Sequence, residues 1–361
     1  MKFRILFSLL LAFLFHTDLF AQQFSFTDAR KLTLVGKANT DTNLCPRVDT
    51  MKYNKMLATV KYLFTHTAGM ALLFKTNSNS IVARWKLTRE KTYVNMTPIT
   101  HSGLDLYIRV KGVWTYAGTG APKALASEAT LVKEMESGEK ECLLYLPLYN
   151  GIEHIEIGVS TGSYLTPLDN PFRGKVAVYG SSITQGASAS RPGLAYLSQL
   201  TRMCNINFIN LGLSGNEKME APVADMVADI DADVYVLDCA ANPSDAEITE
   251  RTAAFVQKIR SRHADAPIIM IECVERELGT FNVKTREMVA AHNRAFKEEY
   301  EQLKKAGVKN LYLIESINFL GSDHEGTADG THPNDVGFAR FIEVIKPQLL
   351  AVIGPVLKKK K

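Results

Sequence analysis

The sequence has few cysteines and almost no excess of charge of one sign. Its 361 residues include five cysteines, none of them in a C-x-x-C spacing, which argues against a structural zinc site. The formal net charge is only +4 at pH 7, and four lysines at the end of the chain carry a charge of that size. The body of the chain is therefore near neutral and lacks the basic patch typical of nucleic-acid-binding proteins.

Beyond its first residues the sequence also lacks a long hydrophobic run, an internal repeat and a low-complexity tract. The exception is the N-terminus, where Lys2 and Arg4 precede an apolar stretch over residues 5–15. This pattern predicts a secretory signal over residues 1–21 with cleavage near Ala21. We therefore expect an exported protein, secreted or periplasmic, without a stable membrane anchor. Export permits one disulfide, but the scattered cysteines do not indicate a pairing.

The first half of the remaining chain, residues 22–172, shows short stretches of alternating apolar and polar residues separated by turn residues. This alternation, with few helical windows, predicts an antiparallel β-sandwich of jelly-roll type. The expected strands include residues 61–64, 70–74, 81–87, 104–110, 143–148 and 154–159.

From residue 173 to the C-terminus the pattern changes to strands that alternate with helices. The expected strands are residues 175–179, 207–211, 234–238, 267–272 and 311–314, and the expected helices are residues 193–203, 217–228, 245–262, 284–305 and 335–352. This order predicts a parallel sheet covered by helices on both faces, with its ligand site at the carboxyl ends of the strands.

Polar and small residues that suit hydrolytic chemistry follow several of these strands. Ser182, Gly215 and Asn242 come after the first three, and Asp329 and His332, three residues apart, are expected to open the last helix. A serine hydroxyl becomes a nucleophile when an oriented base takes its proton, and the reaction also needs donors for the developing oxyanion. Singly, each has a plainer interpretation, such as a helix cap for Ser182 or a turn for Asn242. Together they predict a Ser-His-Asp site.

Four blocks in this half resemble those of the SGNH/GDSL hydrolase superfamily and occur in the same order. Residues 180–184 read G-S-S-I-T, residues 210–215 N-L-G-L-S-G, residues 240–242 A-A-N and residues 329–333 D-G-T-H-P. The resemblance implies a three-layer, flavodoxin-like catalytic domain that needs no metal or organic cofactor. It assigns Ser182 as nucleophile, His332 as general base and Asp329 as the group that orients His332. The oxyanion hole would comprise the N–H groups of Ser182 and Gly215 and the side chain of Asn242.

Two of the four blocks depart from the superfamily pattern. Ser181 replaces the aspartate of the first block, and Ala240 and Ala241 occupy third-block positions where glycine is common. The added methyl groups suggest a narrower acyl site. In the first half, residues 102–107 read S-G-L-D-L-Y and resemble the Gly-x-Asp-Leu-Tyr signature of a β-sandwich that precedes such domains in exported bacterial proteins.

These patterns together predict an exported serine esterase that removes a short acyl group, most simply acetyl, from a carbohydrate or a related small-molecule ester. One alternative is a lipase, lysophospholipase or thioesterase, and another is a glycan-binding protein with a silent hydrolase scaffold. The latter leaves the joint presence of Ser182, Asp329 and His332 unexplained. A G-x-S-x-G sequence at residues 158–162 is not a nucleophile elbow, because no helix can follow it. The sequence leaves the oligomeric state open.

Overall fold

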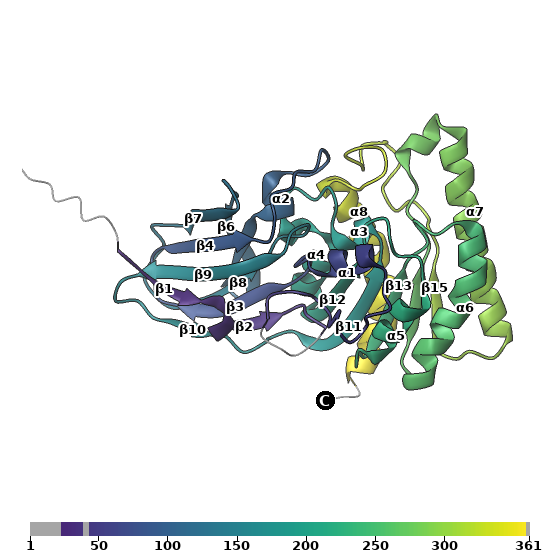
Figure 1. The fold of residues 1–361 in the computed structure, drawn as a ribbon, viewed down its shortest axis with the longest axis horizontal. Coiled ribbons are helices and arrows are strands. Elements are labelled where there is room, and N and C mark those ends of the chain that lie inside the picture. Colours follow the sequence, from purple (N-terminus) through teal and green to yellow (C-terminus); the bar gives the residue numbers. More distant parts are fainter. Residues whose placement is uncertain (1–22, 39–42, 359–361) are drawn as a thin grey trace, which may run out of the picture.

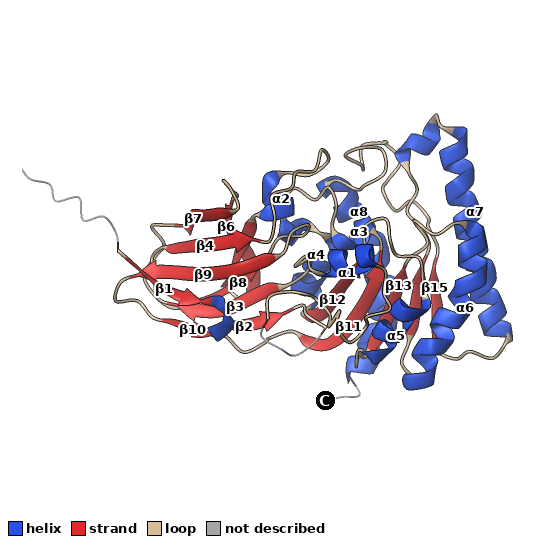
Figure 2. Ribbon diagram, in the orientation of Figure 1, coloured by secondary structure: helices blue, strands red, loops and turns tan. Residues whose placement is uncertain are grey.

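The computed structural model describes residues 23–38 and 43–358, so the predicted signal lies outside the described residues. A β-rich N-terminal part adjoins an α/β C-terminal part (Figures 1 and 2). Within the described ranges, no helix combines the length and apolar composition needed to cross a bilayer. Cys45, Cys142, Cys204, Cys239 and Cys273 are all free thiols.

Two antiparallel sheets form the N-terminal sandwich, as predicted. The first contains β1 (Phe24–Asp28), β9 (Ile152–Ser160), β4 (Ile81–Leu87) and β7 (Ala126–Val132), in that order. In the second, the order is β10 (Leu165–Pro167), β3 (Ala71–Thr76), β8 (Lys140–Tyr145), β5 (Leu104–Val110) and β6 (Val113–Gly120), and β2 (Thr33–Val35) also pairs with β3. Inward-facing side chains such as Leu72, Phe74, Trp85 and Ile157 fill the core.

One predicted strand of this region is wrong. Residues 61–64 belong to helix α1 (Ala58–Phe64), and they pack not in the sandwich but against the parallel sheet. Val60, Leu63 and Phe64 are buried at the i, i+3 and i+4 spacing of one helix face. A run this short and apolar is compatible with either a strand or a buried helix, and tertiary packing selects the helix here.

The C-terminal half is a three-layer α/β domain, as predicted. Its five parallel strands lie in the order β12 (Ile206–Gly212), β11 (Arg173–Gly180), β13 (Val234–Asp238), β14 (Ile268–Ile271) and β15 (Leu311–Ile314). This is the flavodoxin-like strand order 2-1-3-4-5. Val176 and Val178 face α4 (Tyr196–Cys204) and α8 (Asp335–Lys358). Ala177 and Tyr179 face the opposite layer of α1, α5 (Ala221–Asp229), α6 (Asp245–Arg262) and α7 (Val283–Lys305).

Short helical turns complete the chain. They are α2 (Pro98–Ser102), α3 (Ser182–Gln185), and the 3-10 turns η1 (Ala29–Lys31), η2 (Pro192–Leu194) and η3 (Glu277–Thr280).

The outer edge of the parallel sheet is covered by the segment that leads into α1. Arg47 is fully buried and donates hydrogen bonds to the carbonyl oxygens of Asn210 at 2.7 Å and Gly212 at 2.9 Å, both on edge strand β12. A third bond, of 2.9 Å, goes to the carbonyl of Leu63 in α1. Burial lowers the pKa of Arg47 to about 9. The guanidinium thus satisfies edge carbonyls that would otherwise lack partners.

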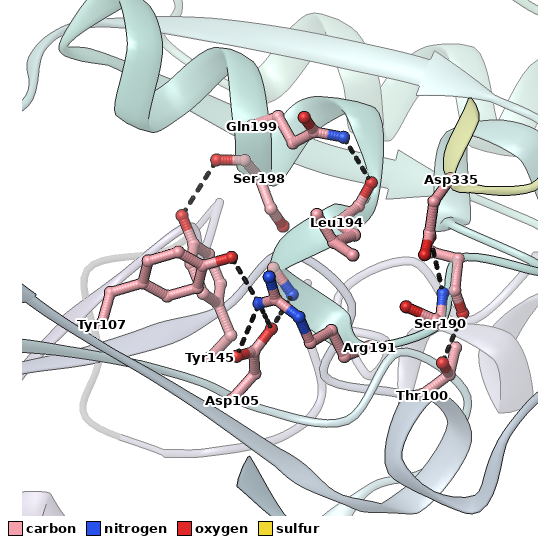
Figure 3. A network of polar contacts seen from close by, with 12 residues as sticks. Thr100, Asp105, Tyr107, Tyr145, Ser190, Arg191, Leu194, Ser198, Gln199 and Asp335 are labelled. Atoms are coloured by element: carbon pink, nitrogen blue, oxygen red, sulfur yellow. Dashed lines mark hydrogen bonds and ion pairs between the residues drawn. The ribbon is translucent and has the colours of Figure 1, made fainter. Parts of the chain in front are cut away.

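The Gly-x-Asp-Leu-Tyr residues form one of the contacts between sandwich and α/β domain (Figure 3). Asp105 is buried on β5 and accepts two hydrogen bonds from Arg191 Nη1, at 2.9 and 2.8 Å, and one from the Gly193 N–H at 2.7 Å. The Tyr107 hydroxyl accepts a further bond from Arg191 Nη1, at 2.6 Å. Gly103 is required by close approach, since a Cβ there would lie 2.5 Å from the carbonyl oxygen of Gly120.

Candidate active site

Ser182 lies at the carboxyl end of β11, an interior strand of the parallel sheet, as the first residue of α3. The strand can turn into the helix because Gly180 has no side chain: a Cβ there would lie 2.0 Å from Thr184 Oγ1 and 2.5 Å from the carbonyl oxygen of Asp238. Ser181 Oγ accepts a 3.1 Å hydrogen bond from the Ile183 N–H and caps the helix. Its capping bond shows what Ser181 does at the first-block position where the superfamily has aspartate.

The structure brings the three predicted catalytic side chains into one hydrogen-bonded row. Ser182 Oγ lies 2.9 Å from His332 Nε2, and His332 Nδ1 lies 2.8 Å from Asp329 Oδ2. Asp329 and His332 do not open the last helix but lie in the loop before it, since α8 begins at Asp335. This arrangement can carry a proton from the serine to the imidazole.

The loop of residues 327–333, called the catalytic loop below because it carries the two candidate catalytic residues Asp329 and His332, keeps Asp329 ionised. Its Oδ1 accepts backbone N–H bonds from His332 at 2.8 Å and Thr331 at 3.0 Å. Partial burial opposes ionisation, but these bonds and the ring of His332 outweigh it and lower the pKa of Asp329 to about 2. An ionised carboxylate accepts only, so the hydrogen-bond pattern assigns a proton to His332 Nδ1 and leaves Nε2 free to accept from Ser182.

The two other predicted oxyanion residues follow the strands on either side of β11. Gly215 comes after β12 and has a φ of +71°, with no atom within 4 Å of the position a Cβ would take. Asn242 comes after β13, and its Nδ2 donates to Glu217 Oε2. Glu217 is fully buried; burial raises its pKa to about 8, against the opposing effect of the Asn242 bond. Because Glu217 takes one N–H of Asn242, it fixes the direction of that amide.

Gln185, at the end of α3, ties the nucleophile segment to its surroundings. Its Oε1 accepts a 3.1 Å bond from the Ser214 N–H next to Gly215, and its Nε2 donates to the Leu148 carbonyl at 3.0 Å. The same Nε2 lies 3.0 Å from Nδ1 of His66, whose pKa burial lowers to about 3, so this ring is neutral and accepts. Gln185 therefore links the first two sequence blocks to the sandwich.

Sequence reasoning missed two site residues that belong to the sandwich. Asn95 Nδ2 lies 3.0 Å from Asp329 Oδ2, and the Tyr149 hydroxyl donates to the Ser182 carbonyl at 3.3 Å. Neither residue lies in a motif, and both contacts join segments far apart in the chain, so no local signal could have identified them.

Two hollows in this half of the molecule do not include Ser182 or His332 in their linings. One, of about 350 Å³, is lined by residues that include Arg276, Leu320 and His324. The other is more open and apolar, and Leu278, Phe281 and Gly330 contribute to it. Gly330 directly follows Asp329, so the second hollow adjoins the catalytic loop.

Comparison with known proteins places both halves of the chain in known families. The GDSL-like Lipase/Acylhydrolase family matches residues 173–350, and the N-terminus of Esterase_SGNH_hydro-type matches residues 24–165. The crystal structure of a protein described as a GDSL-like lipase from Bacteroides ovatus is 52% identical, with a TM-score of 0.91 over 92% of this chain and 98% of that one. No curated protein matches the chain.

More distant structures share the fold. Salicylyl-acyltransferase SsfX3, from a tetracycline biosynthetic pathway, is 20% identical with a TM-score of 0.73 over 91% of this chain and 97% of that one. A family two carbohydrate esterase from Cellvibrio japonicus is 14% identical with a TM-score of 0.60 over 92% and 98% of the two chains.

Fold and relatives together define a carboxylic ester hydrolase of SGNH type, with an antiparallel sandwich ahead of its parallel-sheet domain. The chain belongs to the GDSL-like lipase/acylhydrolase family.

Proposed function

We propose that this acylhydrolase is a serine esterase in which Ser182, His332 and Asp329 act as nucleophile, general base and orienting carboxylate. The observation that carries the proposal is the continuous row of contacts, 2.9 Å from Ser182 Oγ to His332 Nε2 and 2.8 Å from His332 Nδ1 to Asp329 Oδ2. Ser182 is only 9% exposed, which limits competition from water for its hydroxyl proton.

The reaction proceeds in two halves. Ser182 Oγ bonds to the ester carbonyl carbon while its proton passes to His332 Nε2, and the negative charge collects on the carbonyl oxygen. The N–H groups of Ser182 and Gly215 and the second N–H of Asn242 stabilise this oxyanion. When the tetrahedral intermediate collapses, the alcohol leaves with the proton from His332. Water then attacks the acyl-enzyme, gives a proton to His332, and the acid departs as the proton returns to Ser182.

We assign a short acyl group, acetyl in the simplest case, on a carbohydrate or a similar hydroxyl-rich alcohol. The support for a short acyl group is the third sequence block, where Ala240 and Ala241, just beyond β13, occupy positions at which the superfamily commonly has glycine. For the alcohol, the half-buried ring of Tyr93 lies two residues before Asn95 and offers an aromatic face of the kind on which sugars stack. Lys91 Nζ lies 4.8 Å from the centroid of this ring and adds a polar group beside it.

A second candidate, hydrolysis of a longer-chain lipid or thioester, rests on the apolar hollow beside Gly330. Phe281 is 93% exposed there, and Leu278 and Val283 are each about half exposed. Large apolar side chains gathered beside a catalytic loop could accommodate an acyl chain.

Hydrolysis of p-nitrophenyl acetate and p-nitrophenyl octanoate by matched variants tests both candidates. Ser182→Ala should abolish hydrolysis, whereas Ser160→Ala, which alters the serine of the rejected G-x-S-x-G sequence, should retain it. A higher kcat/KM for acetate than for octanoate favours the short-chain assignment, and the reverse order, lost in Phe281→Ser, favours the lipid candidate. Full activity in Ser182→Ala would contradict the triad.

We also propose export with removal of residues 1–21, on the strength of the basic and apolar N-terminal pattern. N-terminal sequencing of the protein recovered from the periplasm or medium should begin near Gln22. A mature protein that retains Met1 would contradict this.

A further inference from the structure

A loop of the sandwich, residues 88–97 between β4 and α2, reaches the catalytic loop of the α/β domain. Asn95 Nδ2 lies 3.0 Å from Asp329 Oδ2 and 3.3 Å from His332 Nδ1. Asn95 and Asp329 are 234 positions apart in the chain. A side chain from the sandwich thus contacts both members of the proposed acid–base pair.

Only one of these two contacts can be a hydrogen bond. His332 Nδ1 carries the proton that it donates to Asp329, so it has no lone pair for the Asn95 amide. The Asp329 carboxylate accepts only, and the opposite amide orientation would place two oxygens against each other. The Asn95 N–H therefore donates to Asp329 Oδ2, and the carboxylate oxygen is shared between this amide and the imidazole.

Asn95 differs from the other donors to Asp329 in where it comes from. The remaining contacts of this carboxylate among the described residues are the N–H groups of Thr331 and His332 and the ring of His332. Those groups belong to the same turn and move with it. The Asn95 amide alone fixes the carboxylate relative to another part of the protein.

We propose that Asn95 is a positioning residue, which holds Asp329 Oδ2 and through it the His332 ring in line with Ser182. The sandwich then completes the active site instead of serving only as an accessory module. This inference rests on the proposed function of Ser182, His332 and Asp329.

The loop that carries Asn95 is anchored beside the nucleophile. Ser188 Oγ donates to the Asn95 carbonyl at 3.0 Å, and Thr97 Oγ1 donates to the Ser190 carbonyl at 2.7 Å. Residues 188–190 begin three positions after the end of α3, and the Arg191–Asp105 pair fixes the next residue to the sandwich (Figure 3). An amide held at both flanks can orient a carboxylate with the accuracy that proton transfer needs.

The charged groups around the catalytic loop define the expected electrostatic effect. Asp329 contacts Asn95 directly. Asp335 accepts a hydrogen bond from the Ser190 N–H at 2.8 Å. Glu277 pairs with His324 in the hollow that includes Gly330. A carboxylate at position 95 would add a negative charge beside the ring of His332 and favour its protonated form.

The test compares Asn95→Ala, Asn95→Asp and the matched control Val94→Ala, whose side chain is fully exposed on the same loop. With p-nitrophenyl acetate as the substrate, Asn95→Ala should lower kcat about tenfold and leave KM little changed. A tenfold lower kcat is about the effect expected from the loss of one hydrogen bond to a charged group. Asn95→Asp should move the acidic limb of the pH–rate profile upward by about one pH unit. Val94→Ala should match the wild type in both.

A second readout does not depend on turnover. In the Ser182→Ala background, the ring protons of His332 followed by NMR should titrate at a higher pH when Asn95→Asp is added. Unchanged kcat in Asn95→Ala, or an unmoved limb and titration in Asn95→Asp, would overturn the inference. If Ser182→Ala retained activity, the proposed function would fail, and the NMR titration would still decide whether residue 95 acts on His332.

Discussion

Replacing Glu217 by glutamine is expected to stabilise the folded protein at neutral and alkaline pH. Glu217 is completely buried and holds the Asn242 amide, and burial raises its pKa from 4.5 to about 8. Glutamine keeps an oxygen that can accept from Asn242 and has nearly the same volume. It differs from the protonated acid mainly in having no charge to acquire.

The sign and size of the effect follow from proton linkage. Between pH 4.5 and 8 the unfolded chain has released this proton and the folded chain has kept it, so the free energy of unfolding falls as the pH rises through this window. At 1.36 kcal/mol per pH unit, the loss is about 3 kcal/mol at pH 7 and approaches about 5 kcal/mol above pH 8. Glu217→Gln removes this loss, so the variant and the wild type should be similar at pH 5 and diverge above it.

Denaturant-induced unfolding at half-unit steps from pH 5 to 8.5 measures the difference in the free energy of unfolding between the two proteins, called the stability gap below. The matched control is Glu250→Gln, because the Glu250 side chain is 72% exposed on α6. The stability gap between this variant and the wild type should not grow with pH. A gap between Glu217→Gln and wild type that stays constant across the range, or a variant less stable at pH 8.5, would refute the reasoning.

Two further substitutions test the catalytic loop and the domain contact. Asp329→Asn should lower kcat by about a thousandfold or more with melting nearly unchanged, because the amide no longer holds His332 in the required tautomer; comparable melts with unchanged turnover would contradict this. Arg191→Ala should reduce the free energy of unfolding by about 3 kcal/mol, because it leaves the buried Asp105 carboxylate without its cation. Adding Asp105→Asn should recover part of that loss in the same denaturation assay, and a loss below about 1 kcal/mol would show that Gly193 N–H and Tyr107 suffice.

Much of the fold was predictable because periodicity reflects burial. Strands 81–87 and 234–238 and helix 245–262 have the bounds observed for β4, β13 and α6, since their apolar spacing matches one face or a fully buried run. The failure at α1 has the same physical origin. Residues 61–64 are apolar in succession, and only the position of the parallel sheet determines that they form a helix.

Some residues of the candidate site were also predictable from the sequence, and others were not. Ser182, Gly215 and Asn242 were predictable because carboxyl ends of neighbouring parallel strands meet at one edge. The Glu217 side chain was placed in a predicted helix, whereas it lies in the turn before α5 and is buried against Asn242. Asn95 was missed because its role depends on a contact across 234 positions. The residues next to Asn95 in the sequence give no indication of such a contact.

The Gly-x-Asp-Leu-Tyr residues give the proposed role of Asn95 its structural basis. An amide that positions a carboxylate is useful only if the two parts keep a fixed relation to within a fraction of an ångström. Asp105 and Tyr107 supply that relation through Arg191, only nine residues after Ser182. Arg47, in the segment between β2 and α1, supplies a second attachment, to the edge strand β12 of the parallel sheet. Removing residues 23–172 would therefore remove both the cover of the sheet edge and the Asn95 contact with Asp329, which ties the two halves into one structural unit.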